Sequence, residues 1–114
     1  MIGKLAAIAE ACDLTLPERY VRPVGLVGTG AILDVAHLPA YQAAGIPVAA
    51  VWGRTRGHAE RLAQTHDIAR VHNTLEELLA DPEVAVVDIA VTPEAQVEVA
   101  LQALEAGKDV ICQK

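Results

Sequence analysis

The sequence has no serine and no phenylalanine, and it contains only two cysteines, one tryptophan and two tyrosines. The absence of serine excludes a serine-nucleophile hydrolase. Cys12 and Cys112 lie far apart, whereas a small secreted scaffold carries more cysteines, so we expect two reduced thiols in a cytoplasmic protein. With 9 basic against 15 acidic residues and few aromatics, the chain lacks the positive patch and the stacking surfaces of a nucleic-acid binder.

Long hydrophobic runs are also absent. None approaches the roughly 20 residues of a membrane span, so we expect no membrane insertion. The apolar stretch from Leu5 to Ala9 ends at Glu10 and is shorter than the core of a signal peptide. We instead expect a short amphipathic helix over residues 3–13, within an N-terminal extension of residues 1–21.

Small and β-branched residues are abundant, because 21 alanines and 14 valines supply over half of the apolar residues. From residue 22 onward, short apolar segments alternate with segments of helical spacing. This alternation predicts an α/β fold, a doubly wound parallel sheet with strand order 3-2-1-4-5 and helices on both faces. The strands are expected at 23–28, 47–52, 69–72, 84–91 and 109–112, and the helices at 31–44, 57–65, 74–81 and 94–106. Pro39 interrupts the first of these helices, so that its first turn and its body are expected as separate pieces.

A glycine-containing turn follows the first expected strand and opens the first helix. Its first glycine permits a tight turn, and its second leaves space for a pyrophosphate to approach the backbone. The N-terminus of the helix then offers free N–H groups to the phosphates. Leu33 stands where the full dinucleotide-binding fingerprint has a third glycine, and a purely structural turn is the alternative. The residues expected to bind the cofactor here are Gly28, Thr29, Gly30, Ala31 and Ile32.

The end of the second strand indicates which dinucleotide binds. An acidic residue at this place selects NAD through the ribose 2′-OH, whereas an arginine accommodates the 2′-phosphate of NADP. The chain has no carboxylate there but reads Gly53-Arg54-Thr55-Arg56, which favours NADP over NAD as the cofactor. Two alternatives remain: both arginines are solvated loop charges, or one stacks on the adenine of either cofactor. Gly53, Arg54 and Thr55 are the expected binding residues.

Several further segments carry a family resemblance. They are His37 to Ala40, Thr74 to Pro82, Val87 to Ala90 followed by Pro93, and Ala103 to Lys114. In this order and spacing, after the glycine turn, they resemble the N-terminal NAD(P)-binding Rossmann domain of the Gfo/Idh/MocA family over residues 22–114. The resemblance implies a pyridine-nucleotide oxidoreductase that transfers a hydride to or from sugars, cyclitols or related polyols.

The resemblance also implies site residues near the nicotinamide. The loop after the fourth strand would lie over the nicotinamide side of the cofactor, and glutamine replaces a histidine that the family often has there. A Gln-Lys pair stands where the family has Glu-Lys-Pro, and its lysine matches one that assists proton transfer or orients the substrate. The implied cofactor-binding residues are Val91, Thr92, Pro93, Gln96 and Gln113, and the implied catalytic residue is Lys114. The substrate domain of the family follows this motif, so we expect a truncated chain whose polyol substrate needs the missing domain.

The remaining candidates favour structural roles. We interpret His37 as a structural residue of the first helix, and we expect no metal site, since His58, His66 and His72 lack zinc-ligand spacing with cysteines. Asp88 lies within an apolar strand, where a buried carboxylate needs a partner, and we expect a helix terminus or a backbone contact.

Two other functions stay open at this point. The chain could be a stand-alone nucleotide-binding or redox-sensing module without catalysis. It could also be a fragment that forms a homo-oligomer through an exposed sheet edge or apolar face.

Overall fold

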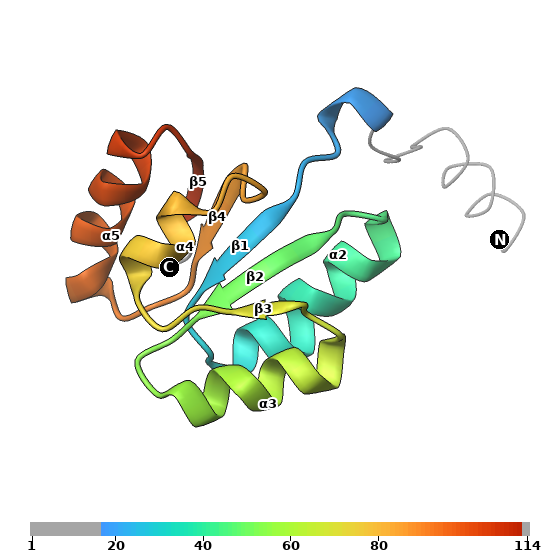
Figure 1. The fold of residues 1–114 in the computed structure, drawn as a ribbon. Coiled ribbons are helices and arrows are strands. Elements are labelled where there is room, and N and C mark those ends of the chain that lie inside the picture. Colours follow the sequence, from blue (N-terminus) through green and yellow to red (C-terminus); the bar gives the residue numbers. More distant parts are fainter. Residues whose placement is uncertain (1–16, 113–114) are drawn as a thin grey trace, which may run out of the picture.

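The computed structural model describes residues 17–112, which form one five-stranded parallel sheet with helices on both sides (Figure 1). The strand order is β3-β2-β1-β4-β5, which confirms the predicted doubly wound fold. The expected helix over 3–13, Gln113 and Lys114 lie outside the described residues. The strands are β1 (Val24–Val27), β2 (Val48–Trp52), β3 (Arg70–Val71), β4 (Val86–Ile89) and β5 (Asp109–Cys112).

The helices form two layers. In Figure 1, α2 and α3 cover one face of the sheet, and α4 and α5 cover the other. None of the helices in this part of the chain has the length and apolar character needed to cross a membrane. The helical segments are η1 (Glu18–Tyr20), η2 (Leu33–His37), α2 (Leu38–Ala44), α3 (Arg56–His66), α4 (Leu75–Ala80) and α5 (Pro93–Glu105).

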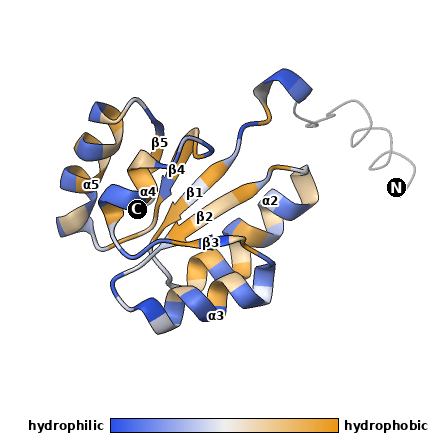
Figure 2. Ribbon diagram, viewed as in Figure 1, coloured by the Kyte–Doolittle hydropathy of each residue, from blue (hydrophilic) through white to orange (hydrophobic). Residues whose placement is uncertain are grey.

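The central strand β1 is apolar and buried along its length because helices cover both faces of the sheet (Figure 2). Leu26 and Val27 are neighbours in β1, and both are fully buried. Leu26 belongs to the cluster that contains Leu62 of α3, whereas Val27 belongs to the cluster that contains Leu78 of α4. Successive side chains of β1 therefore point to opposite faces of the sheet and pack into two separate cores, one on each side.

Two helix ends follow the predicted signals. Gly45 ends α2 with a φ of 71°, the left-handed conformation that glycine adopts without strain. At the start of α4, the Thr74 hydroxyl accepts the N–H of Glu77 at 3.1 Å, as the capping box predicts. The Glu77 carboxylate reaches one residue further back than expected, and accepts the N–H of Asn73 at 2.9 Å.

The first long helix changes its winding before Pro39. Proline has no N–H to donate to the carbonyl of Val35, so a regular α-helix cannot continue through this point. The structure runs instead through a π-helical turn, η2, in which the N–H of Leu38 bonds to the carbonyl of Leu33, five residues earlier. Pro39 then lies in the first turn of α2. The predicted interruption is therefore present as a widened turn.

Candidate functional site

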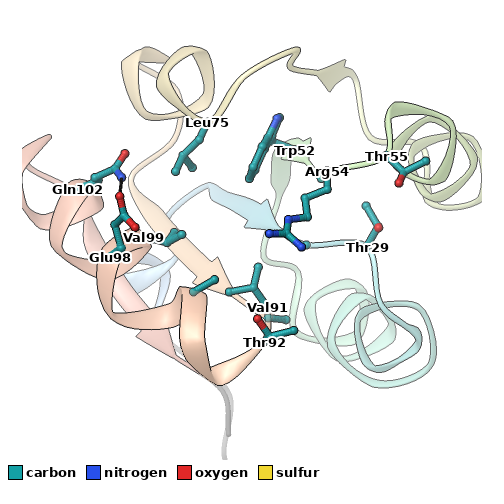
Figure 3. A pocket seen from close by; sticks show the side chains of 14 residues that line it. Thr29, Trp52, Arg54, Thr55, Leu75, Val91, Thr92, Glu98, Val99 and Gln102 are labelled. Atoms are coloured by element: carbon teal, nitrogen blue, oxygen red, sulfur yellow. Dashed lines mark hydrogen bonds between the residues drawn. The ribbon is translucent and has the colours of Figure 1, made fainter.

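A cavity of about 430 Å³ opens at the carboxyl ends of β1, β2 and β4 (Figure 3). In a doubly wound sheet this edge, at the reversal of strand order between β1 and β4, is where ligands bind. The glycine turn, the loop after β2 and the loop after β4 all contribute to the lining. Of the residues expected to bind a cofactor, those that line this cavity are Gly28, Thr29, Gly53, Arg54, Thr55, Val91 and Thr92.

Gly28 is the tightest point of the glycine turn. Its φ is +118°, and a Cβ built on it would lie 2.4 Å from the carbonyl oxygen of Ala90. Its N–H donates to the carbonyl of Trp52 at 2.8 Å. Both the backbone conformation and the contact with the β4 loop therefore require glycine here.

Gly30 lies in open space, where a Cβ would meet no atom within 4 Å. A phosphate can approach the backbone there, at the start of the helical segment whose first N–H groups have no intrahelical acceptor. This cradle fits the pyrophosphate of a dinucleotide. Gly30 and Ala31 line a neighbouring hollow of about 400 Å³ beside α3, and Ile32 is half exposed. Leu33, in the third glycine's place, is fully buried against the sheet.

The two arginines after β2 have different surroundings. Arg54 is exposed, lines the cavity and has no hydrogen-bond or ion-pair partner among residues 17–112. Figure 3 shows its guanidinium extending from the β2 loop toward Thr92 of the β4 loop. Arg56 lies outside the lining, where its Nε donates to Glu60 at 2.8 Å and its guanidinium also bonds to Asn73. Arg54 therefore supplies the positive charge of this cavity.

The loop after β4 is held by the start of α5. Val91 and Thr92 line the cavity, whereas Pro93 begins α5 outside the lining. Gln96 also lies outside the lining and donates from Nε2 to the carbonyl of Val91 at 3.3 Å. The structure therefore places Gln96 behind the loop, in contact with its backbone.

The cavity extends further along α5 than the sequence predicted. Glu98 and Gln102 project into it beside Val99 and Leu75 (Figure 3), and Gln102 Nε2 lies 3.5 Å from Glu98 Oε1. Glu98 and Gln102 are four residues apart, so they share one face of α5. Once Val99 is known to face the sheet, this spacing could have identified both of them as residues that line the cavity. Sequence reasoning missed them because charged helix positions are usually solvated.

A buried polar cluster joins β4 to the first helix. Asp88 of β4 is fully buried, and its Oδ2 accepts the Tyr41 hydroxyl at 2.7 Å and lies 2.8 Å from His37 Nδ1. Burial, together with the hydrogen bond to Asp88 and the negative charge of that carboxylate, raises the pKa of the Tyr41 hydroxyl. The expected helix terminus or backbone partner of Asp88 was therefore wrong, because two side chains from the first helix reach across to it.

Two of the other histidines, His66 and His72, pair with carboxylates. His66 Nε2 lies 2.6 Å from Asp34, and His72 Nε2 lies 3.0 Å from Asp81. Burial of Asp81 opposes its ionisation, but the bonds from His72 and from the N–H of Glu83, with the charge of Arg70, hold its pKa below the usual value. Among the described residues, no group of three or more potential ligands is arranged to hold a metal ion.

Comparison with known proteins agrees with this geometry. A family model described as "Oxidoreductase family, NAD-binding Rossmann fold" matches residues 22–114. An uncharacterized oxidoreductase of Synechocystis is 41% identical over 92 residues, which are 80% of this chain and 24% of the relative. The chain thus spans about a quarter of the length of the curated relatives it matches.

The solved structures that resemble this chain include complexes with bound dinucleotides. A mutant 3-ketoreductase from Actinomadura kijaniata, in complex with TDP-benzene and NADP, is 28% identical with a TM-score of 0.76, over 82% of this chain and 29% of its own. Levoglucosan dehydrogenase, in complex with NADH and L-sorbose, is 30% identical with a TM-score of 0.74, over 82% of this chain and 27% of its own. The chain therefore belongs to the Gfo/Idh/MocA oxidoreductase family, and residues 22–114 match its NAD-binding Rossmann domain.

Proposed function

We propose that this chain is the cofactor-binding part of an oxidoreductase that prefers NADP to NAD. The observation that carries the preference is the unpartnered guanidinium of Arg54 at the end of β2, beside Gly53, where an NAD-specific sheet would present a carboxylate. A guanidinium offers a planar fork of donors that matches a phosphate. In this proposal Arg54 binds the 2′-phosphate of the adenosine ribose, and Thr55 adds a hydroxyl.

The other candidate residues divide the remaining cofactor between them. Gly28, Thr29, Gly30, Ala31 and Ile32 would hold the pyrophosphate through backbone N–H groups, as the open space at Gly30 supports. The loop after β4 would lie against the nicotinamide side, and Gln96 would keep that loop in place through its bond to Val91. The residues proposed for that side are Val91, Thr92, Pro93, Gln96 and, beyond the described part of the chain, Gln113.

The bound nicotinamide would accept a hydride from a hydroxyl-bearing carbon of a sugar, cyclitol or related polyol, or would donate one to the corresponding carbonyl carbon. The complexes of levoglucosan dehydrogenase with L-sorbose and with levoglucosan support this substrate class. Lys114 is the proposed catalytic residue, assisting proton transfer or orienting the substrate. In this proposal, residues 22–114 form one dinucleotide-binding domain after a short extension. The substrate domain would correspond to the part of the relatives that this chain does not span. The free, exposed thiol of Cys112 fits a reducing compartment such as the cytoplasm.

Titration of the chain with NADPH and NADH, followed by dinucleotide fluorescence, tests the cofactor proposal. We expect wild type to bind NADPH more tightly than NADH. Arg54→Ala should weaken NADPH binding about tenfold and change NADH binding little, since the lost contact is to the 2′-phosphate. Arg56→Ala is the matched control, because Arg56 is bonded to Glu60 outside the cavity, and it should leave both affinities near wild type. Tighter binding of NADH, or equal effects of the two substitutions, would refute the preference.

A further inference from the structure

Glu98 and Gln102 form a polar pair at the side of the cavity that α5 provides. In Figure 3 they lie on the opposite side of the cavity from Thr29 and Thr55, with the Arg54 guanidinium between the two sides. In the proposed binding mode, the phosphates and the adenosine ribose lie on the side of Thr29 and Arg54. The base of the adenosine would therefore extend toward the Glu98–Gln102 pair.

The cavity walls next to this pair are apolar. Leu75 and Val99 are buried, and they line the cavity together with Trp52. The one polar atom of the Trp52 side chain, Nε1, donates to the carbonyl of Asn73 at 3.2 Å, so the indole offers only ring carbons to a ligand. A purine has two apolar faces and a polar edge. Its faces can lie against these apolar walls while its edge reaches the polar pair.

The pair presents a hydrogen-bond acceptor beside a donor. Gln102 Nε2 lies 3.5 Å from Glu98 Oε1, so the amide turns its nitrogen toward the carboxylate. In the described part of the chain this is the only hydrogen bond of either side chain, and Glu98 forms no ion pair there. An ionised carboxylate only accepts hydrogen bonds, and an amide nitrogen carries two N–H groups. One carboxylate oxygen and one amide N–H are therefore left for a ligand.

We propose that the Glu98–Gln102 pair determines which base of a dinucleotide the protein accepts, and that it selects adenine. Adenine carries an amino group, N6, which donates, next to ring nitrogens, N1 and N7, which accept. The Glu98 carboxylate accepts from N6, and the Gln102 amide donates to the adjacent ring nitrogen. A base with a carbonyl oxygen in place of the amino group turns an acceptor toward the carboxylate and is disfavoured. This inference rests on the proposed binding of a dinucleotide, and it adds the residues that recognise the base.

The probe for this proposal is the hypoxanthine analogue of NADPH, in which a carbonyl at C6 of the base replaces the amino group. Titration followed by dinucleotide fluorescence should show that wild type binds NADPH about tenfold more tightly than this analogue. In Glu98→Gln the new amide can turn either its oxygen or its nitrogen to the base, so the preference should fall below about twofold. Glu105→Gln is the matched control, because it removes the same charge from the last residue of α5, outside the cavity lining, and it should keep the wild-type preference.

A stability measurement separates loss of recognition from loss of the fold. Glu98 is exposed, so Glu98→Gln should have the urea midpoint of wild type, and its changed preference then reports contact with the base. Equal affinity of wild type for the two bases, or an unchanged preference in Glu98→Gln, would overturn the proposal.

The same comparison with NADH and its hypoxanthine analogue distinguishes this inference from the proposed function. The preference between the bases should be the same as with NADPH, because the 2′-phosphate is not varied. Tighter binding of NADH than of NADPH would refute the NADP preference and leave the recognition of adenine intact. Binding that does not distinguish the bases would refute the recognition of adenine alone. If no dinucleotide binds, both proposals fail.

Discussion

Substitution of Tyr41 by phenylalanine tests how the first helix is attached to the sheet. Asp88 is fully buried, and both of its observed partners, Tyr41 and His37, bond to the same oxygen, Oδ2. Its other oxygen, Oδ1, is buried without a hydrogen-bond partner in the described part of the chain. Removing the tyrosine hydroxyl would leave this carboxylate with one bond, that from His37. Hydrogen bonds to charged groups contribute about 1.5–3 kcal/mol each, so we expect a loss of about 2 kcal/mol in the free energy of unfolding.

Thermal and urea denaturation measure this loss. With an unfolding entropy of about 2 cal/mol/K per residue, 2 kcal/mol corresponds to a decrease in Tm of about 8 °C. Because phenylalanine retains the ring, the change reports the hydrogen bond and not a cavity. In a background where Asp88 is replaced by leucine, the same tyrosine substitution should cost little. A loss below about 0.5 kcal/mol, or the same loss in both backgrounds, would refute the role of this hydrogen bond.

The pH dependence of this difference gives a second check. The folded-state pKa of Tyr41 is raised above its ordinary value of 10.0, so its contribution to stability is fully present below about pH 10. Above that pH the unfolded chain ionises first, and the contribution decreases. We therefore expect the advantage of wild type over Tyr41→Phe to be constant at neutral pH and to shrink in alkaline solution. An advantage that grows above pH 10 would contradict the direction of the shift.

Two further predictions concern the glycine turn and the buried carboxylate of Asp81. Gly28→Ala should lower the free energy of unfolding by about 3 kcal/mol, because alanine is strained at a φ of +118° and its Cβ would overlap the Ala90 carbonyl, and urea denaturation checks this. The lowered pKa of Asp81 implies that its contribution to stability is present above its ordinary value of 3.8 and is lost as the pH falls through the folded value. The stability difference between wild type and Asp81→Asn should therefore narrow in acid; a constant difference from pH 7 to pH 2 would contradict this.

The helix ends and the order of the strands could be predicted because they depend on residues that are close together in the sequence. Gly45 and the Thr74–Glu77 pair mark helix ends through contacts within a few residues, and the alternation of apolar segments predicts the order of the strands. The fourth strand is shorter than predicted: Val84 is buried in the core but lies outside β4, because apolar character reports burial and not strand pairing. Burial is thus easier to predict than the limits of a strand.

Contacts between distant parts of the chain were not predictable in the same way. Asp88 bonds to His37 and Tyr41, which lie 51 and 47 positions away, and nothing near Asp88 in the sequence identifies them. The close approach of Thr29 to Gly53 likewise depends on how two loops meet at the sheet edge. The glycine turn itself was predicted from its sequence context, whereas the contact of its Thr29 with Gly53 was not.

The π-helical turn of η2 sets the rotational phase between two parts of the same helix. On its N-terminal side lies the glycine turn, and on its C-terminal side lies the body that Tyr41 attaches to β4. Removal of one residue from this turn, such as the exposed Val35, would take away the extra residue that the wide turn contains and would rotate the segment before it relative to the segment after it. The helix body could then keep its place only if the glycine turn rotated relative to the sheet. The length of the chain between Leu33 and His37 is therefore constrained, although these residues lie outside the lining of the cavity at the sheet edge, and related chains should show few insertions or deletions there.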